Sequence, residues 1–302
     1  MKKVIVMGAT GMIGQALIRQ CLAAGLTTLA IDRPCEKLKN IPSHPSVKIL
    51  ECDIARLAEV KPAEQYDAFI HLGWKSTSTH SRDDVYGQTE NIKYALDAVK
   101  LAKRFGCTVF VGAGSQAEYG RVEGLVSPQS AIRPENGYGI AKFAAGALTR
   151  ILCGQLGIRH NWARILSVYG PGDNDYTMIM HCVRTLLAGE KPIVTECGQM
   201  WDYLYCDDVA KALLAIADKG RRDSVYCIGS GRERRMREYV EIIRDAINPS
   251  AEIGFGERAY NKNQVMRLLG DIAPLTEDTG FVPEVPFEEG IRRTIEWCRE
   301  NG

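Results

Sequence analysis

The amino-acid sequence predicts an α/β fold: a Rossmann-type, doubly wound parallel sheet followed by a smaller C-terminal mixed α/β lobe. Through the first half of the chain, short β-branched apolar runs alternate with longer segments whose apolar residues recur at helical spacing. A glycine-rich turn joins the first run to the first helical segment. Strands that alternate with helices form a parallel sheet, because right-handed crossovers place helices on both of its faces.

The first half supplies the elements of a Rossmann core in order. Strands are predicted at residues 4–7, 27–31, 47–52, 68–72 and 107–112. Helices are predicted at residues 12–24, 85–105 and 137–156.

The second half changes character after Tyr169-Gly170-Pro171-Gly172, which ends a strand predicted at residues 161–168. Helices are expected at 178–188, 235–247 and 287–299, and strands at 203–206 and 225–228. Asp207 or Asp208 is expected to be the N-cap of one further helix. We therefore expect a Rossmann domain at residues 1–166 and mainly a substrate-binding lobe at 167–302, which is discontinuous because residues 207–230 return to the first domain.

The composition is that of a globular protein and excludes several partners. The 302 residues are 45% hydrophobic and 25% charged, and 38 basic against 37 acidic side chains give a net charge of +1. Such a balance provides no overall field to attract nucleic acid or an anionic membrane. The chain contains no run of eighteen apolar residues, so a soluble protein with a small-molecule substrate is expected, with no nucleic-acid or membrane partner.

The ten cysteines are scattered and form no C-x-x-C pair. This spacing suits neither a zinc site nor a disulfide framework, so no metal centre is predicted. Several of the cysteines lie within apolar runs, where a reduced thiol behaves as a small hydrophobic group. The pattern indicates a reducing compartment and hence a cytoplasmic location.

The turn at residues 8–14 has the spacing G-x-x-G-x-x-G and stands between the first strand and the first helix. Glycines at such a position permit a tight turn and bring backbone N–H groups against a pyrophosphate at the helix N-terminus. The alternative is a turn that only joins strand to helix. The residues expected to bind a dinucleotide here are Gly8, Thr10, Gly11, Met12, Ile13 and Gly14.

Two acidic residues at strand ends are candidates for the adenosine half of that cofactor. Asp32 follows Gly14 by eighteen residues, where a carboxylate accepts hydrogen bonds from ribose hydroxyls and favours NAD. The adjacent Arg33 is suited to a ribose 2′-phosphate, so NADP remains an alternative. Asp53 is placed to meet the adenine, or else caps the turn that follows it.

Tyr138 and Lys142 are four residues apart on a predicted helix, so both side chains project from one face. A phenol with an ordinary pKa of about 10 is a poor base at neutral pH, but a nearby ammonium and a nicotinamide cation favour the phenolate. Its oxygen can then exchange a proton with an alcohol or ketone. On its own, this spacing also occurs by chance on helix surfaces.

Ser115 strengthens that interpretation, because it follows a predicted strand at the sheet edge where such folds bind ligands. Its hydroxyl can hydrogen-bond the reacting oxygen, whereas a serine at a turn is more commonly only a turn residue. The three residues occur in the expected order on the expected elements. Together they predict transfer of a hydride to or from a sugar-like alcohol or ketone.

The chain resembles the extended short-chain dehydrogenases/reductases, the NAD(P)-dependent nucleotide-sugar epimerase/dehydratase family, over essentially its whole length. The matching segments are residues 8–14, Asp32, and residues 52–54, 71–73, 115–120, 138–142, 169–172 and 201–209. The resemblance implies that Ser115 and Tyr138 are catalytic and that the substrate lies between the lobes. It also implies cofactor contacts from the glycine turn and from Asp32, Asp53, Ile54, Leu72, Gly73, Tyr138 and Lys142.

Departures from the family pattern narrow the reaction. Related dehydratases carry an acid directly after the catalytic Ser or Thr, whereas this chain has Gln116 and Ala117, and Glu118 would face the opposite way in an extended segment. We therefore expect a 4-ketoreductase acting on a nucleotide-linked keto-deoxysugar, or alternatively an NAD-dependent nucleotide-sugar 4-epimerase. The reductase is preferred because Trp201 stands where many similar epimerases have a diphosphate-binding Arg.

The expected substrate contacts are Ser115, Gln116, Trp201 and Ser167, the last of which stands where the family often has Asn. Arg258, Lys262 or Arg267 is an alternative source of positive charge for a diphosphate. The resemblance further implies a homodimer formed by the helix at 85–105 and the one after Tyr138. A non-catalytic NAD(P) sensor or scaffold on the same fold is the alternative from another class, against which the intact Ser115, Tyr138 and Lys142 set argues.

Overall fold

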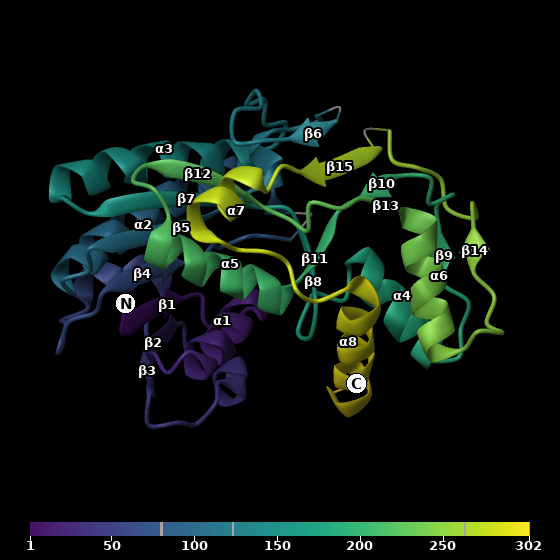
Figure 1. Cartoon of the computed structure of the whole chain (residues 1–302), viewed down its shortest axis with the longest axis horizontal. Helices are drawn as coiled ribbons and strands as arrows, with labels where there is room; N and C mark the ends of the chain where they lie inside the picture. The colour runs from purple at the N-terminus through teal and green to yellow at the C-terminus, as the bar shows by residue number, and fades with distance from the viewer. Residues whose placement is uncertain (79–80, 123, 263, 302) are drawn as a thin grey trace.

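Seven parallel strands form the central sheet of the computed structural model, which describes residues 1–78, 81–122, 124–262 and 264–301 (Figure 1). Their order across the sheet is β12 (Ser224–Ile228), β7 (Arg159–Ile165), β5 (Val109–Ser115), β4 (Ala68–His71), β1 (Lys3–Met7), β2 (Thr27–Asp32) and β3 (Val47–Glu51). The order doubles back at β1, which pairs with both β2 and β4. The predicted doubly wound sheet is confirmed.

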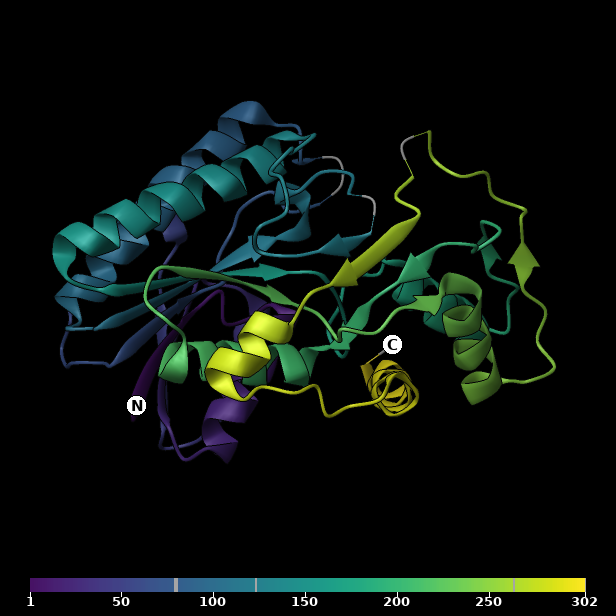
Figure 2. The ribbon, with the colours of Figure 1, turned by 45° about the horizontal axis from the view of Figure 1, so that its top comes forward.

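Helices cover both faces of this sheet (Figure 2). On one face lie α2 (Val85–Arg104) and α3 (Gly137–Leu156), and on the other lie α1 (Met12–Ala23) and α5 (Cys206–Lys219). Successive residues of β1 alternate between the two cores: Val4 and Val6 belong to the cluster that contains α1 and α5, while Ile5 and Met7 belong to the one beneath α2. An all-apolar strand is the form expected of a sheet buried on both faces.

The strand predicted at residues 107–112 is displaced, because β5 begins at Val109 and continues to Ser115. Glycines at 112 and 114 indicate a turn when the sequence is considered alone. In the structure both lie within the strand, and the indole of Trp162 on β7 occupies the space their side chains would fill. Ser115 is the last residue of β5, which confirms its predicted position at the end of a strand.

The single strand predicted at residues 161–168 is wrong. The chain forms β7 as far as Ile165, leaves the main sheet at Leu166, and begins β8 (Ser167–Tyr169). β8 pairs with β11 (Tyr203–Tyr205) in a separate two-stranded sheet. Ser167 directly follows the break, but no glycine or proline stands there, and the run from 161 to 168 is otherwise compatible with one strand.

The predicted Asp N-cap of the following helix is also wrong. Helix α5 begins at Cys206, its N-cap is Tyr205, and both aspartates lie in its first turn. Asp208 instead accepts hydrogen bonds from the backbone N–H groups of Glu284 and Val285, at 3.0 and 2.8 Å. Asp207 pairs with Arg19 on α1 at 2.8 Å. Tertiary contacts, rather than local capping, determine where these carboxylates lie.

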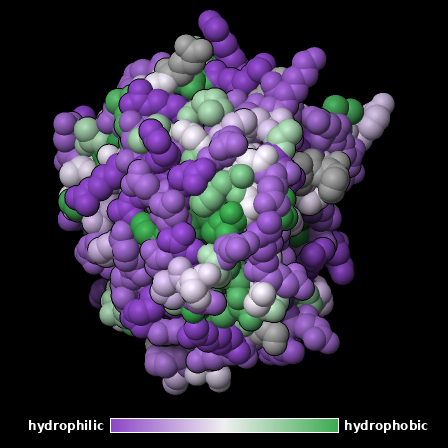
Figure 3. Space-filling view, turned by 90° about the vertical axis from the view of Figure 1, so that its right-hand side faces the viewer, coloured by the Kyte–Doolittle hydropathy of each residue, from purple (hydrophilic) through white to green (hydrophobic). Residues whose placement is uncertain are grey.

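A smaller mixed lobe follows and includes α4 (Met178–Leu187), α6 (Met236–Ile247) and α8 (Phe287–Asn301). Its four-stranded sheet runs β13 (Arg234–Arg235), β10 (Met200–Trp201), β15 (Arg267–Gly270) and β6 (Leu125–Val126), and a two-stranded sheet joins β14 (Gly254–Phe255) to β9 (Ile193–Val194). β10 pairs antiparallel with β13 and parallel with β15, so this sheet is mixed. Seen from the right of Figure 1, the surface is largely hydrophilic, with apolar side chains in small groups (Figure 3).

Segments from the two halves of the chain are interwoven. β12 completes the edge of the main sheet, and α7 (Ala273–Thr279) packs on β12 and α5. Conversely, β6 comes from the first half and pairs with β15 of the mixed sheet. Among the described residues, none of the helices combines the length and apolar character that a membrane crossing requires.

Candidate active site

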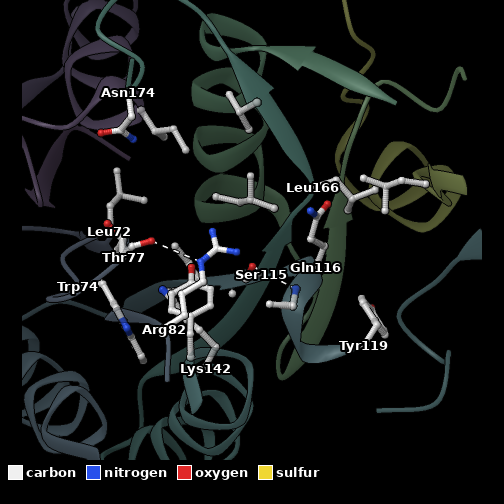
Figure 4. A pocket seen from close by; sticks show the side chains of 18 of the residues that line it. Leu72, Trp74, Thr77, Arg82, Ser115, Gln116, Tyr119, Lys142, Leu166 and Asn174 are labelled. Atoms are coloured by element: carbon white, nitrogen blue, oxygen red, sulfur yellow. Dashed lines mark hydrogen bonds between the residues drawn. The ribbon is translucent and has the colours of Figure 1, made fainter. Parts of the chain in front are cut away.

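A cavity of about 580 Å³ lies beyond the carboxyl ends of the central strands, between the main sheet and the mixed lobe. Its walls come from the turn after β1, the ends of β4 and β5, the start of α3, and part of β10 and β15. Figure 4 shows Ser115, Lys142 and Arg82 gathered near its centre, with Trp74 to one side. A crevice outside the carboxyl ends of parallel strands is the usual ligand position in such sheets.

The turn between β1 and α1 is built so that only glycine fits at two points. Gly8 has a φ of +86°, and a Cβ there would lie 2.7 Å from the backbone nitrogen of Gly73. A Cβ on Gly14 would lie 2.2 Å from the Gly8 carbonyl oxygen. The exposed start of α1 therefore lies unusually close to the strand, with its free N–H groups toward the cavity. This cradle fits the pyrophosphate of a dinucleotide.

Helix α3 carries Tyr138 and Lys142 to the same cavity. The side chain of the N-cap residue, Asn136, accepts a hydrogen bond from the Gly139 N–H at 2.8 Å, which fixes the start of the helix. Tyr138 lies in the first turn and Lys142 one turn later, and both line the cavity as their spacing predicts.

The Lys142 ammonium is almost fully buried, with 4% of the residue exposed. It donates to the Ala113 carbonyl at 2.7 Å and stands 3.9 Å from the ring centre of Trp74. Burial lowers the pKa of Lys142 to about 7, and the negative charge of Glu118 partly opposes that fall. Lys142 thus changes charge near neutrality.

Trp74 was not predicted as a site residue, although it directly follows the matching segment that ends at Gly73. Its indole N–H donates to Gln88 on α2 at 2.9 Å, which fixes the ring beneath the Lys142 ammonium. An aromatic residue just after a strand end is the signal that could have identified it. The ring gives the buried Lys142 ammonium a cation–π contact in place of the water molecules that surround an exposed ammonium.

Opposing effects act on the pKa of the Tyr138 phenol. Desolvation raises the pKa of its phenol, while a hydrogen bond with Ser115 and the positive charge of Arg82 lower it. The Arg82 guanidinium lies 5.1 Å from the phenol ring centre, and the Lys142 ammonium lies 5.7 Å from it. Sequence reasoning identified the lysine but missed the arginine, which lies outside any recognisable motif in the loop before α2.

Ser115 ends β5 and caps the 3₁₀ helix η4 (Gln116–Glu118), since its hydroxyl accepts from the Ala117 N–H at 3.2 Å. The predicted extended conformation after Ser115 is therefore wrong. Gln116 and Ala117 nevertheless line the cavity. Glu118 is fully buried and is directed into the protein, where Arg164 pairs with it.

The acidic residues proposed for the adenosine half have partners within the chain. Asp32 accepts from the backbone N–H and the hydroxyl of Thr10, both at 2.8 Å, while Arg33 is exposed. Asp53 accepts from the Ala55 N–H and pairs with Lys75 at 3.0 Å. Asp53 thus caps the turn that follows it, and both of these contacts are made by its Oδ1 atom.

Trp201 is held by a hydrogen bond from its indole N–H to the Ser167 hydroxyl at 2.8 Å. It also lines a second cavity of about 540 Å³, and among the described residues it alone faces both cavities. The described lining of the second cavity includes one guanidinium, from Arg258, beside amide, hydroxyl and aromatic groups. Arg267 lines the first cavity but forms two hydrogen bonds with Glu233, and Lys262 lines neither.

Most of the predicted site residues meet at the first cavity. Those that line it are Gly8, Gly11, Met12, Ile13, Gly14, Leu72, Ser115, Gln116, Tyr138, Lys142 and Trp201. Thr10, Asp32, Arg33, Asp53, Ile54, Gly73 and Ser167 are not among its lining residues.

A Rossmann sheet with a glycine cradle and a Ser, Tyr and Lys set at one cavity defines a nicotinamide-dependent enzyme of the short-chain dehydrogenase/reductase type. Residues 4–229 match the NAD dependent epimerase/dehydratase family, which is more than half of the chain. The protein belongs to that family, and NAD(P) is its cofactor.

Relatives with different reactions are similar to the whole chain. A putative UDP-glucose 4-epimerase of Methanocaldococcus jannaschii is 27% identical and matches over 99% of both chains. A GDP-6-deoxy-D-mannose reductase of Pseudomonas aeruginosa is also 27% identical, over 97% of this chain and 96% of its own. The structure of a UDP-N-acetylglucosamine 4-epimerase from Methanobrevibacter ruminantium superposes with a TM-score of 0.89 at 21% identity, covering 100% and 99% of the two chains.

Proposed function

We propose that the protein is an NAD(P)-dependent 4-ketoreductase of a nucleotide-linked keto-deoxysugar. The observation that carries this proposal is the convergence of Ser115, Tyr138 and Lys142 on the cavity that also contains the glycine cradle. A reductase needs only a proton donor, a hydrogen-bond donor to the carbonyl, and a bound hydride source. The first two are present at one end of α3 and at the end of β5.

In the proposed reaction, bound NAD(P)H supplies the hydride. The Tyr138 hydroxyl donates a proton to the carbonyl oxygen of the sugar, and the Ser115 hydroxyl donates a hydrogen bond to the same oxygen. The phenolate that results is stabilised by Arg82 and Lys142, the two cations closest to its ring. Gln116 and Ala117 stand where similar dehydratases carry an acid, which disfavours water elimination; the carboxylates that line the cavity, Glu135 and Asp173, come from other segments.

The second candidate is an NAD-dependent nucleotide-sugar 4-epimerase, which would use the same three residues and which the Methanocaldococcus relative favours. Trp201 supports the reductase, because an uncharged indole stands where many similar epimerases have an arginine. The test measures how much reduced cofactor is consumed for each 4-keto-sugar nucleotide that is converted. A reductase consumes one NADH or NADPH per product, whereas an epimerase turns over with tightly held NAD and no net change in absorbance at the wavelength of the reduced cofactor.

The remaining site assignments are part of the same proposal. The cradle and Asp32 hold the dinucleotide, together with Ile54, Leu72 and Gly73, and Arg33 and Asp53 contact its adenosine end. Ser115, Gln116, Ser167 and Trp201 contact the substrate. Residues 1–166 with 207–230 form the cofactor domain, and the rest of 167–302 forms the substrate lobe. The ten free cysteines, nine of them buried, support a reducing cytoplasmic location.

We propose that the protein is a homodimer joined through α2 and α3. Apolar side chains stay exposed along α3, with Ile140 at 54%, Phe143 at 41%, Leu148 at 42% and Ile151 at 52%, and Tyr86 at the start of α2 is 86% exposed. The four α3 positions form one stripe at helical spacing. An apolar stripe of this kind is stabilised when a second copy covers it.

The double variant Phe143→Asp/Ile151→Asp is expected to elute as a monomer, because two carboxylates would be buried without partners in the dimer. Light scattering at micromolar concentration measures the mass. Val282→Asp is the control, since Val282 is 57% exposed but lies between α7 and α8, away from the stripe. A wild-type protein that is monomeric in this measurement contradicts the proposal.

A further inference from the structure

Directly behind Ser115 lies a carboxylate with no access to solvent. Glu118 is 0% exposed, and each of its oxygens has a partner. One oxygen accepts from the Ser115 backbone N–H and from the Trp162 indole N–H, both at 2.9 Å. The other accepts from the Arg164 guanidinium at 2.7 Å. The backbone of Ser115 is therefore anchored to a charged group.

The partner of this carboxylate is itself held in place. Arg164 is 5% exposed and donates to the Tyr119 hydroxyl at 2.9 Å. Tyr119 in turn contacts the thiol of Cys227 on β12 at 3.3 Å. Replacing a buried ion pair with apolar side chains commonly leaves the stability of a protein unchanged. The buried Glu118–Arg164 pair is therefore better explained by a functional role than by a contribution to stability.

We propose that Glu118, paired with Arg164, is a positioning residue that fixes the Ser115 hydroxyl and sets the pH range in which Tyr138 and Lys142 act. The proposal rests on the roles given above to Ser115, Tyr138 and Lys142. Glu118 touches neither cavity, so its effect reaches the reacting atoms only through Ser115 and through its charge. Within the described part of the chain, no other carboxylate contacts the Ser115 backbone.

The charge of Glu118 acts on both titrating residues in the same direction. It raises the pKa of the Tyr138 phenol and the pKa of the Lys142 ammonium. A negative charge disfavours the phenolate and favours the ammonium, so the sign is the same for the two groups. Loss of this charge would therefore lower both pKa values and move the alkaline limit of activity to lower pH.

Two histidines, one cysteine and one tyrosine that face the cluster stay neutral near pH 7. Burial lowers the pKa of His71 on β4 to about 3 and that of His160, stacked on Trp162, to about 4. Burial raises the pKa of the Cys227 thiol to about 11, and it also raises that of the Tyr119 phenol. Tyr176 faces Tyr138 from the segment before α4. The charged groups closest to Ser115, Tyr138 and Lys142 include Glu118, Arg164 and Arg82, and Glu135 and Asp173 line the same cavity. Burial raises the pKa of the Asp173 carboxyl to about 6.

The test is the pH dependence of kcat/KM for Glu118→Gln, which keeps the shape of the side chain and removes its charge. We expect the alkaline limb of the profile, where Tyr138 loses its proton and Lys142 its charge, to move to lower pH by on the order of one unit, with a several-fold loss of kcat. Tyr119→Phe is the matched control, since it breaks the same network without changing its charge. Its alkaline limb should stay at the wild-type position. An alkaline limb of Glu118→Gln that stays in place or moves to higher pH would overturn the proposal.

A second variant covers the case in which Glu118→Gln fails to fold. Glu118→Met/Arg164→Met removes both charges with apolar side chains of similar length. It is expected to fold, to lose at least about tenfold in kcat because the Ser115 anchor is lost, and to keep the dinucleotide KM within about twofold because the glycine cradle is unchanged. Wild-type kcat and pH profile in this variant would also overturn the proposal. Failure of the proposed function is distinguishable, since wild-type protein would then show no turnover.

Discussion

Tyr138→Phe is expected to lower kcat by about 10²- to 10⁴-fold, because it removes the proton donor while leaving the ring in place. The ring packs edge-on against Trp74 at 6.1 Å and lies beneath Arg82, and neither contact involves the hydroxyl. The fold and the cofactor affinity should therefore persist. Turnover of reduced cofactor with a keto-sugar nucleotide measures the loss, and calorimetric titration with the dinucleotide confirms that binding remains.

Tyr94→Phe is a suitable control for that experiment. Tyr94 is 8% exposed, and its hydroxyl donates to Glu90 at 2.8 Å on α2, away from the lining of the cavity. This variant should keep kcat within about twofold of wild type. If Tyr138→Phe keeps the biological activity while it still binds dinucleotide, the catalytic assignment is wrong and the sensor alternative is favoured.

Gly14→Ala is expected to abolish dinucleotide binding and to destabilise the fold by about 1–3 kcal/mol. The new methyl group would meet the Gly8 carbonyl oxygen at 2.2 Å and two backbone atoms of Ala9 at 2.9 Å. None of these is a flexible side chain, so the turn itself has to move. Thermal unfolding and cofactor titration measure the two effects separately.

Gly11→Ala separates folding from binding in the same turn. Gly11 has φ −71° and ψ 162°, which any residue adopts, and a Cβ there would come only within 3.6 Å of Gly8. We expect stability within about 0.5 kcal/mol of wild type and a weakened affinity for dinucleotide, because the methyl group occupies the path of the pyrophosphate. Unchanged affinity in both variants would mean that the dinucleotide does not bind at this turn.

Local patterns in the sequence were sufficient for the main sheet and its helices. The alternation of strands and helices and the glycine turn predicted a strand at the place of each of the seven central strands, and both helical layers. The misplaced boundaries share one cause. At Leu166 and at Asp207, the end or start of an element is decided by partners far along the chain, such as Ile228 for Leu166 and Arg19 for Asp207.

In the candidate site, too, the residues set by local patterns were predictable and those set by distant partners were not. Ser115, Tyr138 and Lys142 were predictable because their order and spacing reflect the elements that carry them. Arg82, Trp74 and the Glu118–Arg164 pair were missed, since each acts through a neighbour that is distant in sequence. Arg164 is forty-six residues from Glu118, and nothing in the intervening segment predicts that the two side chains meet.

Trp201 lines two chambers of similar size, and its indole N–H is held by the Ser167 hydroxyl. A ligand that reaches from one chamber into the other passes this ring. We therefore expect the size of the side chain at position 201 to limit the length of the ligands that use both chambers.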